Sequence, residues 1–466
     1  MPSSIEHRAH SVNALQAQLI RLALPLLLEL SLGVAAGVVG TVLAGQFADS
    51  SAAAFAISIQ FFHTAFLIFR IVGAGISVVV AQQLGYGNPI AAETVSRTAL
   101  LASLITGGLA ASVLGFGAAF LLDQFQVPSD VSRQAKPLIQ WLAPCVWMDA
   151  VVVAMASVMR AHLYAVQSLR IMILMHLSHC FLAWLLMHHG FGLSGFAIAF
   201  MVSRLLSLLL LTKAWQRYLG IKPVWRTTPI LDRSACVAIL RIGLPGAAEN
   251  AVWRLGFMAS VAAASQLGTA ALATQAYVLQ FNTMILLAGF AMGLAAEILV
   301  GRLIGQTDLR QARDLVKRVT WTSLSVSGGI SLIVAVSGPW LLAMLTDDIA
   351  IREEGARLLW ISVLLETGRS FNLVLLGSLR AAGDARFALF AGMPSVVLLL
   401  AGGSWLFGVH WGWGLTGIWL AYAADEWARG LTIWRRWISL QWLPAARQSL
   451  QRMRQEKKGA ETSAPE

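Results

Sequence analysis

Long, uninterrupted runs of apolar residues dominate the chain, and short polar stretches separate them. Each run is about 17 residues or longer, near the roughly 20 apolar residues that a helix needs to cross a bilayer. Strands of a transmembrane barrel would instead alternate apolar and polar positions over about 10 residues. The pattern therefore predicts an all-α polytopic membrane protein with twelve transmembrane helices. They cover about residues 21–45, 52–84, 98–122, 137–159, 171–187, 192–211, 243–267, 277–304, 319–345, 356–379, 387–407 and 415–434.

The second half of the chain repeats landmarks of the first half. Pro25 and Glu29 open the first apolar run, and Pro245 and Glu249 recur 220 residues later with the same spacing. Further pairs at this offset are Gly85 with Gly305, Asn88 with Asp308, and Arg160 with Arg380. We therefore predict two homologous six-helix halves. Because six is even, both halves enter from the same side and form parallel repeats around a central cavity.

The distribution of Lys and Arg predicts the boundaries and the orientation. We expect an N-terminal repeat at 1–212, a basic cytoplasmic linker at 213–241, a C-terminal repeat at 242–437 and a cytoplasmic tail at 438–466. With the N-terminus inside, inner loops and tails hold roughly 25 Lys and Arg residues against about 4 in outer loops, as the positive-inside rule requires. We therefore expect a multi-pass protein of the cell membrane, the bacterial inner membrane, with both termini in the cytoplasm.

The composition agrees with a membrane protein and narrows the function classes. Of 466 residues, 57% are hydrophobic and 12% are charged, whereas soluble domains carry about 25% charged residues. The net charge of +11 lies mainly in loops and the tail, so we expect the lipid bilayer, and no nucleic acid, as a partner. The three cysteines show no metal-binding or disulfide spacing, and the sequence contains no phosphate-binding GxxxxGK[ST] loop. We expect no cofactor, no metal centre and a monomer.

Charged side chains inside apolar runs are costly, so each is a candidate functional residue or half of a structural ion pair. The C-terminal half is the richer one, and we expect a cation-coupling role for its acids Glu249, Glu366, Asp425 and Glu426. A supporting polar network is expected from Arg369, Asn250, Asn372, Arg429, Asp149 and Glu29.

Helical spacing suggests how some of these charges pair. Glu366 and Arg369 lie three residues apart on one helical face, as do Glu426 and Arg429. We expect an arginine to neutralise one of the adjacent acids Asp425 and Glu426 and to leave the other free. Glu297, near Arg302, is expected to have a structural role.

Two kinds of chemistry fit acids in an apolar setting. A dry site favours the protonated form of a carboxylate, which can then load and release a proton near neutral pH. Carboxylate and amide oxygens together also suit Na⁺, a hard cation, and Asn250 and Asn372 would supply the amides. The sequence leaves H⁺ and Na⁺ open as the coupling ion.

Several stretches resemble the multidrug and toxic compound extrusion (MATE) transporters, which are twelve-helix cation-coupled exporters. They are Leu24-Pro25 with Val39-Gly-Thr-Val-Leu-Ala-Gly45, Gly243-Leu-Pro-Gly-Ala-Ala-Glu249, Ala295-Ala-Glu-Ile-Leu-Val-Gly301 and Leu379-Arg380-Ala-Ala-Gly-Asp384. In that family a glutamate matching Glu249 commonly takes part in cation coupling. This sequence departs from the family at Gly40, where an aspartate is widely used, and at Arg369, where many relatives carry an acid. Glu366-Thr-Gly-Arg-Ser-Phe-Asn372 therefore marks a distinct branch.

The resemblance implies a secondary active antiporter. It would export amphipathic, cationic organic compounds in exchange for H⁺ or Na⁺ by alternating access, with small organic molecules as substrates. One alternative is a lipid-linked glycan flippase of the same superfamily, although such proteins often carry extra spans and a strongly basic cavity. An integral-membrane enzyme is a third reading, but it would need a catalytic cluster at one interface. The acids within spans favour a transporter over an enzyme.

Overall fold

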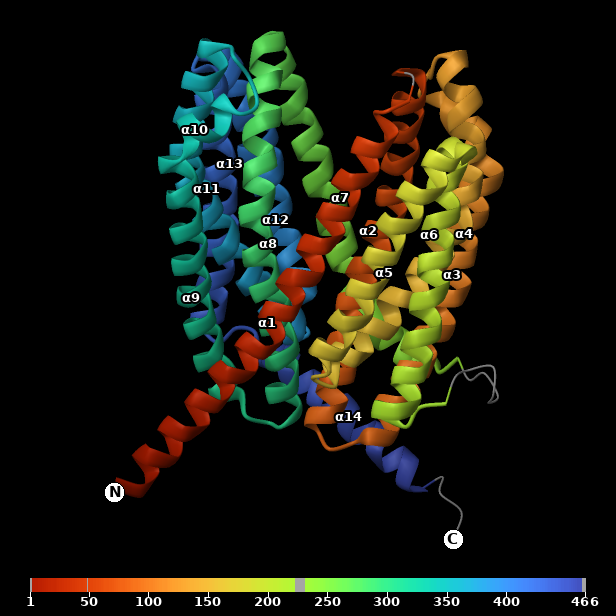
Figure 1. The fold of residues 1–466 in the computed structure, drawn as a ribbon. Coiled ribbons are helices and arrows are strands. Elements are labelled where there is room, and N and C mark those ends of the chain that lie inside the picture. The colour runs from red at the N-terminus through yellow and green to blue at the C-terminus, as the bar shows by residue number, and fades with distance from the viewer. Residues whose placement is uncertain (1, 48, 223–230, 463–466) are drawn as a thin grey trace. The chain divides into compact units, whose positions relative to one another are not determined.

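The computed structural model describes residues 2–47, 49–222 and 231–462, and these residues form helices joined by short turns (Figure 1). The first repeat contains α1 (Pro2–Ala44), α2 (Asp49–Gly85), α3 (Pro89–Gln124), α4 (Ser129–Ala161), α5 (Ala165–Leu186), the π-helical turn η1 (Met187–Phe191), α6 (Gly192–Ala214) and η2 (Trp215–Leu219). The second contains α7 (Arg233–Ser265), α8 (Thr269–Gly305), α9 (Leu309–Val336), α10 (Gly338–Ala343), α11 (Ile349–Ala381), α12 (Ala385–Ser395), η4 (Val396–Gly402), η5 (Ser404–His410), α13 (Gly414–Ile438) and α14 (Leu443–Thr462).

The predicted all-helical fold with twelve spans is confirmed. Within the described residues, nine helical stretches are long and apolar enough to cross a membrane, and one of them, Ala165–Leu219, contains both α5 and α6. In α2 the segment Val72–Gly85 is apolar but short. Helix α13 completes the twelve, although its charged residues lower its hydropathy. Helix α7 begins at Arg233, so it extends into the basic stretch 213–241; Pro223, Arg226 and Pro229 of that stretch lie outside the described residues.

The chain forms two compact units, which we describe separately. One unit holds most of Leu24–Gly243, and the other holds Leu244–Glu466 together with the chain up to Ala23 and the turn Gly85–Gly87. In the first unit, α4 packs against α3 and α6, and α5 packs against α6. In the second unit, α11 packs against α8, α9 and α13. Helix α11 is therefore the central element of the unit that carries most of the predicted site.

Glycine allows α8 and α11 to approach each other closely. A Cβ added to Gly377 of α11 would lie 3.0 Å from the backbone oxygen of Gly293 on α8, and one added to Gly293 would lie 3.0 Å from that of Leu373. Small residues permit such backbone contact between membrane helices, where packing rather than hydrophobic burial drives association. These two helices thus form a tightly packed pair.

The turns of the two repeats share their conformation even where their residues differ. Asn88 and Asp308 each cap the following helix, since their side chains accept a hydrogen bond from the backbone nitrogen of Ala91 and Gln311 respectively. A left-handed φ precedes each cap, +74° at Gly87 and +64° at Thr307. Both pairs are 220 residues apart, so the repeat extends to the backbone.

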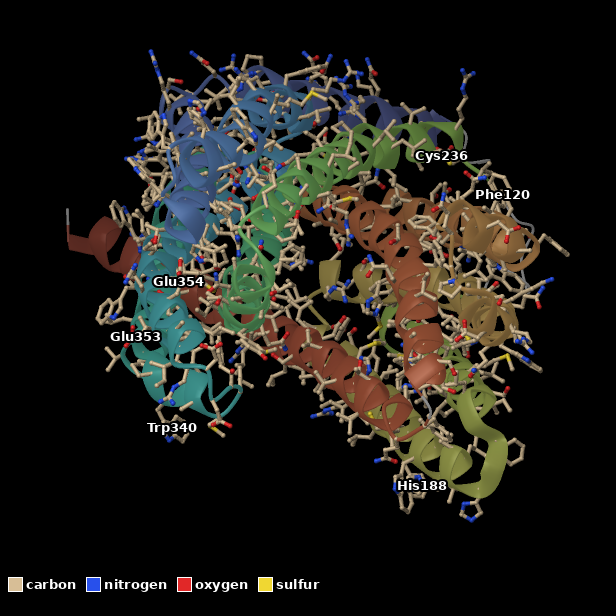
Figure 2. The ribbon with its side chains drawn as sticks, turned by 90° about the horizontal axis from the view of Figure 1, so that it is seen from above. Phe120, His188, Cys236, Trp340, Glu353 and Glu354 are labelled. Atoms are coloured by element: carbon tan, nitrogen blue, oxygen red, sulfur yellow. The ribbon has the colours of Figure 1, made fainter. Side chains whose placement is uncertain are left out.

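The ends of the second unit carry polar and aromatic side chains. Figure 2 shows Trp340 of α10 and Glu353 and Glu354 of α11 on the same side of this unit, where Trp340 and Glu353 are exposed. After α13 the tail forms an amphipathic helix, α14, which is not predicted by the sequence pattern. Trp442, just before α14, stacks on Trp437 with ring centroids 4.4 Å apart.

Candidate functional site

The four acids predicted to couple cations belong to one unit and lie on three of its helices. Glu249 is on α7, Glu366 is on α11, and Asp425 and Glu426 are on α13. Ion pairs through two arginines join all four into one set, which we call the carboxylate network. Their side chains are buried or nearly so, the most exposed being that of Glu249 at 12%.

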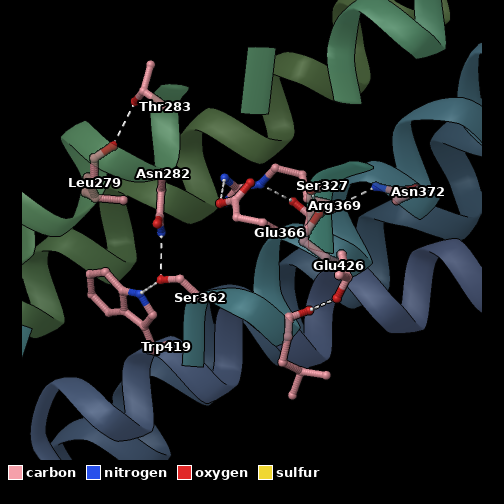
Figure 3. Close-up of polar contacts among 12 residues, drawn as sticks. Leu279, Asn282, Thr283, Ser327, Ser362, Glu366, Arg369, Asn372, Trp419 and Glu426 are labelled. Atoms are coloured by element: carbon pink, nitrogen blue, oxygen red, sulfur yellow. Dashed lines mark hydrogen bonds and ion pairs between the residues drawn. The ribbon is translucent and has the colours of Figure 1, made fainter. Parts of the chain in front are cut away.

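Arg369 links α11 to α13. Its Nη1 donates to Glu366 Oε1 at 2.6 Å, one turn earlier on the same helix, and its Nε donates to Glu426 Oε1 at 3.3 Å (Figure 3). Asn372 adds a second link, since its Nδ2 donates to Glu426 Oε2 at 2.9 Å. The spacing predicted the first contact, and the packing of α11 against α13 supplies the other two.

Arg429 joins the remaining acids. Its Nη2 lies 2.7 Å from Asp425 Oδ2 and 3.0 Å from Glu426 Oε2, and its Nη1 lies 3.8 Å from Glu249 Oε1. Asp425 Oδ1 also accepts a hydrogen bond from Ser395 Oγ of α12 at 2.7 Å. Both adjacent acids are thus paired, and the expectation that one of them stays free was wrong. Glu249 has the longest of these ion pairs.

Two buried oxygens of the network lack a donor. Among the described residues, none donates a hydrogen bond to Glu366 Oε2 or to Asn372 Oδ1. Burying an acceptor without a partner is unfavourable. Both oxygens can therefore accept a proton-bearing or cationic partner.

Glu29 and Asp149, predicted to support the network, belong to the other unit and form their own pairs. Arg160 Nη1 donates to Glu29 Oε1 at 3.0 Å, and Arg204 Nε donates to Asp149 Oδ1 at 3.2 Å. The Arg204 guanidinium also lies over the Phe200 ring, 3.5 Å from its centroid, a favourable cation–π geometry. Glu29 and Asp149 are thus paired within their own unit and are not part of the carboxylate network.

Asn250 takes no part in the network. It follows Glu249 on α7, and no side-chain hydrogen bond or ion pair within the described parts of the chain joins it to the four acids. No group of three or more His, Cys, Asp or Glu side chains in these parts is arranged to hold a metal ion. The candidate ligands for Na⁺ among the described residues are therefore the carboxylate oxygens of the network and the amide oxygen of Asn372.

Glu297 pairs with Arg380, a partner that the sequence did not predict. Arg380 of α11 donates from Nε to Glu297 Oε1 at 3.1 Å and from Nη2 to Glu297 Oε2 at 3.0 Å, a two-point contact typical of arginine with a carboxylate. Arg380 is the repeat counterpart of Arg160, which binds Glu29. The repeat therefore indicated equivalent positions for the two arginines, although it did not predict which acids they contact.

Comparison with known proteins identifies the chain. The MatE family model matches residues 25–185 and 245–405, so the two matches are themselves 220 residues apart. The chain is 26% identical over 430 residues to the uncharacterized transporter YisQ of Bacillus subtilis, covering 91% of this chain and 94% of that one. It is 23% identical to the probable multidrug resistance protein NorM of Chromobacterium violaceum, over 78% of this chain and 80% of that one.

The fold is also that of a solved transporter. The Vibrio cholerae MATE transporter VcmN in its bent form superposes with a TM-score of 0.84 at 20% identity, covering 94% of this chain and 99% of that one. The family match in both repeats agrees with the internal repeat and with the twelve spans. The protein therefore belongs to the MatE family, the multidrug and toxic compound extrusion transporters, and is a membrane transporter rather than an enzyme.

Proposed function

We propose that this protein is a secondary active antiporter that exports amphipathic, cationic organic compounds in exchange for H⁺ or Na⁺ by alternating access. The observation that carries the proposal is the carboxylate network: four acids on α7, α11 and α13, buried inside spans and joined through two arginines. Ionisable groups inside spans mark substrate or ion pathways. The name of the NorM relative, a probable multidrug resistance protein, supports the substrate class.

Glu249 is the proposed coupling residue. Its ion pair with Arg429, at 3.8 Å, is longer than any other in the network, so this acid is the one held least closely by the two arginines of the network. The coupling ion and the organic cation then compete for this charge, and loading either one releases the other. Glu366, Asp425 and Glu426 complete the coupling set, and Arg369, Arg429 and Asn372 hold it in place.

Glu249→Gln tests this role. In proteoliposomes, the wild-type protein is expected to accumulate a fluorescent cation such as ethidium against its gradient when a pH or Na⁺ gradient is imposed. The variant keeps the side-chain shape but loses the charge, so gradient-driven transport should fall at least tenfold while the protein still purifies as a folded species. Undiminished transport by the variant would remove Glu249 from the mechanism. Comparing the two gradients identifies the ion.

We also propose that the protein lies in the cell membrane, the bacterial inner membrane, with both termini in the cytoplasm, and that it works as a monomer. The excess of Lys and Arg in the loops and tails on the side of the termini supports this orientation. Light scattering of the purified protein in detergent tests the monomer, because a dimer would double the protein mass.

A further inference from the structure

The carboxylate network carries more negative than positive charge. Its four acids, Glu249, Glu366, Asp425 and Glu426, are connected by only two arginines. The neighbouring pair of Glu297 and Arg380 is neutral and leaves this balance unchanged. When all groups are ionised, the network has two uncompensated negative charges. Isolated charges buried away from water are strongly unfavourable and are neutralised by protons or bound cations.

The two excess charges fall at opposite ends of the network. Glu426 contacts Arg369, Arg429 and Asn372, and Asp425 contacts Arg429 and Ser395, so both central acids are well compensated.

The end members are less well compensated. Glu366 depends on Arg369 alone, and its Oε2 accepts no hydrogen bond from the described residues. Glu249 meets Arg429 only at 3.8 Å. Like charges repel, so the excess is most stable when it is divided between these ends.

Other charged groups face each end. Around Glu249 they are Arg380, Arg429, Asp425 and Glu426. Around Glu366 they are Arg369 and Glu426. Arg380 is held by Glu297 through two hydrogen bonds, so it is not free to neutralise Glu249 by itself.

A neutral side chain of the network offers a second unpaired acceptor, beside the central acid Glu426. Asn372 is buried and follows Glu366 and Arg369 at three-residue steps along α11. Its Nδ2 is used by Glu426, while its Oδ1 accepts no hydrogen bond within the described part of the chain. Glu366 Oε2 and Asn372 Oδ1 are thus two buried acceptor oxygens without a donor among the described residues, and the one on Glu366 belongs to an end member of the network.

We propose that the network loads two monovalent cations per transport cycle, both H⁺ or both Na⁺, one at Glu249 and one at Glu366. This proposal rests on the antiport function proposed above. Each bound cation removes one of the two excess charges, and a cycle that exports one monovalent organic cation then moves one net positive charge inward. Exchange is therefore driven by the membrane potential as well as by the ion gradient.

The stoichiometry is tested in proteoliposomes with ethidium as the monovalent cation. A potassium gradient with valinomycin sets the membrane potential, and the ethidium gradient at zero net flux is measured for imposed pH gradients and, in a second arm, for Na⁺ gradients. For the wild type, the ethidium concentration ratio at zero net flux should be proportional to the square of the ion concentration ratio, and it should change with the membrane potential. For Glu366→Gln the ethidium concentration ratio should be proportional to the ion concentration ratio itself and should not depend on the membrane potential.

Glu93→Gln is the matched control. Glu93 forms a partly exposed pair with Arg97, one turn away, outside the network, so the same chemical change there should leave the wild-type relation intact. A first-power relation in the wild type would overturn the two-ion proposal and leave antiport standing. If no imposed gradient drives wild-type transport, the antiport function itself fails.

A binding measurement covers the case in which Glu366→Gln folds but does not transport. Protons or Na⁺ released when ethidium binds to the detergent-solubilised protein are counted with a pH indicator or a sodium electrode. We expect two ions released per ethidium bound by the wild type, and one each by Glu366→Gln and Glu249→Gln. Release of two ions by Glu366→Gln would exclude Glu366 as the second loading site.

Discussion

At the scale of single residues, the two repeats use equivalent charges differently. Glu29 and Glu249 are repeat counterparts, as are Arg160 and Arg380. In the first repeat Arg160 binds Glu29, but in the second Arg380 binds Glu297. The counterpart of Glu297 is Ser77, whose hydroxyl donates to the backbone oxygen of Ser157. A glutamate in place of this serine engages the arginine, and Glu249 is left with the longer contact to Arg429.

This difference predicts that Glu29 stabilises the fold without coupling ions. Glu29→Gln removes the negatively charged partner of the partly buried Arg160 guanidinium, which also donates a hydrogen bond to Ser157 Oγ. We expect it to lower the free energy of unfolding by about 1–3 kcal/mol, seen as a lower melting temperature. Ethidium transport driven by an ion gradient should persist in the folded fraction.

The double variant Glu29→Gln with Arg160→Gln provides the control. Removing both partners leaves no unpaired charge, so part of the lost stability should return, as for other buried pairs that are replaced together. If Glu29→Gln abolishes coupling while the melting temperature is unchanged, Glu29 is a coupling residue and our distinction between the two glutamates fails.

The sequence drew attention to the acids of the network but predicted few of the contacts between them. Each acid of the network stood out as a charge within an apolar run, and three-residue spacing predicted the contact of Glu366 with Arg369. The contacts that cross between helices, such as Arg369 with Glu426, depend on how α11 and α13 are rotated against each other. Spacing along one helix carries no such information. The pair of Asp425 with Arg429 was missed for another reason: it joins residues four apart on the same helix, a spacing that also allows contact but was not considered beside the three-residue step from Glu426.

At the scale of elements, the repeat preserves backbone conformation in the turns. Leu163 follows α4 with a φ of +66°, and its counterpart Gly383 follows α11 with a φ of +84°. Left-handed backbone is costly for a residue with a side chain and nearly free of strain for glycine. One repeat thus has the residue suited to this turn, and the other does not.

Leu163→Gly should therefore stabilise the protein. The strain relieved is about 1–2 kcal/mol, and the greater freedom of glycine in the unfolded chain cancels about 0.5–1 kcal/mol of it. A small rise in melting temperature is expected, measured by following tryptophan fluorescence on heating.

The reverse change supplies the comparison. Gly383→Ala should lower the melting temperature, because the new Cβ would lie 2.7 Å from Ser449 Oγ in addition to the backbone strain. A destabilising Leu163→Gly would show that packing of the leucine side chain outweighs the strain.

Helix existence was easier to predict than helix ends. Apolar runs located the spans, but α7 begins at Arg233, earlier than the run at about 243 suggested. Basic residues at that end interrupt the apolar pattern without interrupting the helix. Helix α14 was missed for a related reason: it is polar on most of its surface, and only a few side chains such as Ala446 and Met453 are buried.

At the scale of the whole molecule, an even number of spans requires both termini to lie on one side of the membrane. The positive-inside rule predicts the cytoplasm for that side. Glu353 and Glu354, in the second turn of α11, should then face outward (Figure 2).

Cysteine labelling can test this orientation. After Cys145, Cys180 and Cys236 are replaced, a membrane-impermeant maleimide should label Glu353→Cys in intact cells. It should label Arg454→Cys, on the exposed side of α14, only after the cells are permeabilised. Both positions are exposed, so accessibility within the protein does not limit the reaction. Labelling of Arg454→Cys in intact cells would reverse the proposed topology.

The close glycine contact between α8 and α11 has a practical consequence for following this protein during turnover. Backbones that meet at Gly293 and Gly377 leave no room for the two helices to slide without breaking contact. Spin labels at exposed sites on this pair, such as Met284 and Trp360, should report one narrow distance distribution whether or not ions and substrate are bound. The distance between labels on α8 and α11 can serve as a fixed internal reference. Label pairs elsewhere whose distances broaden or shift during turnover then identify the parts that move.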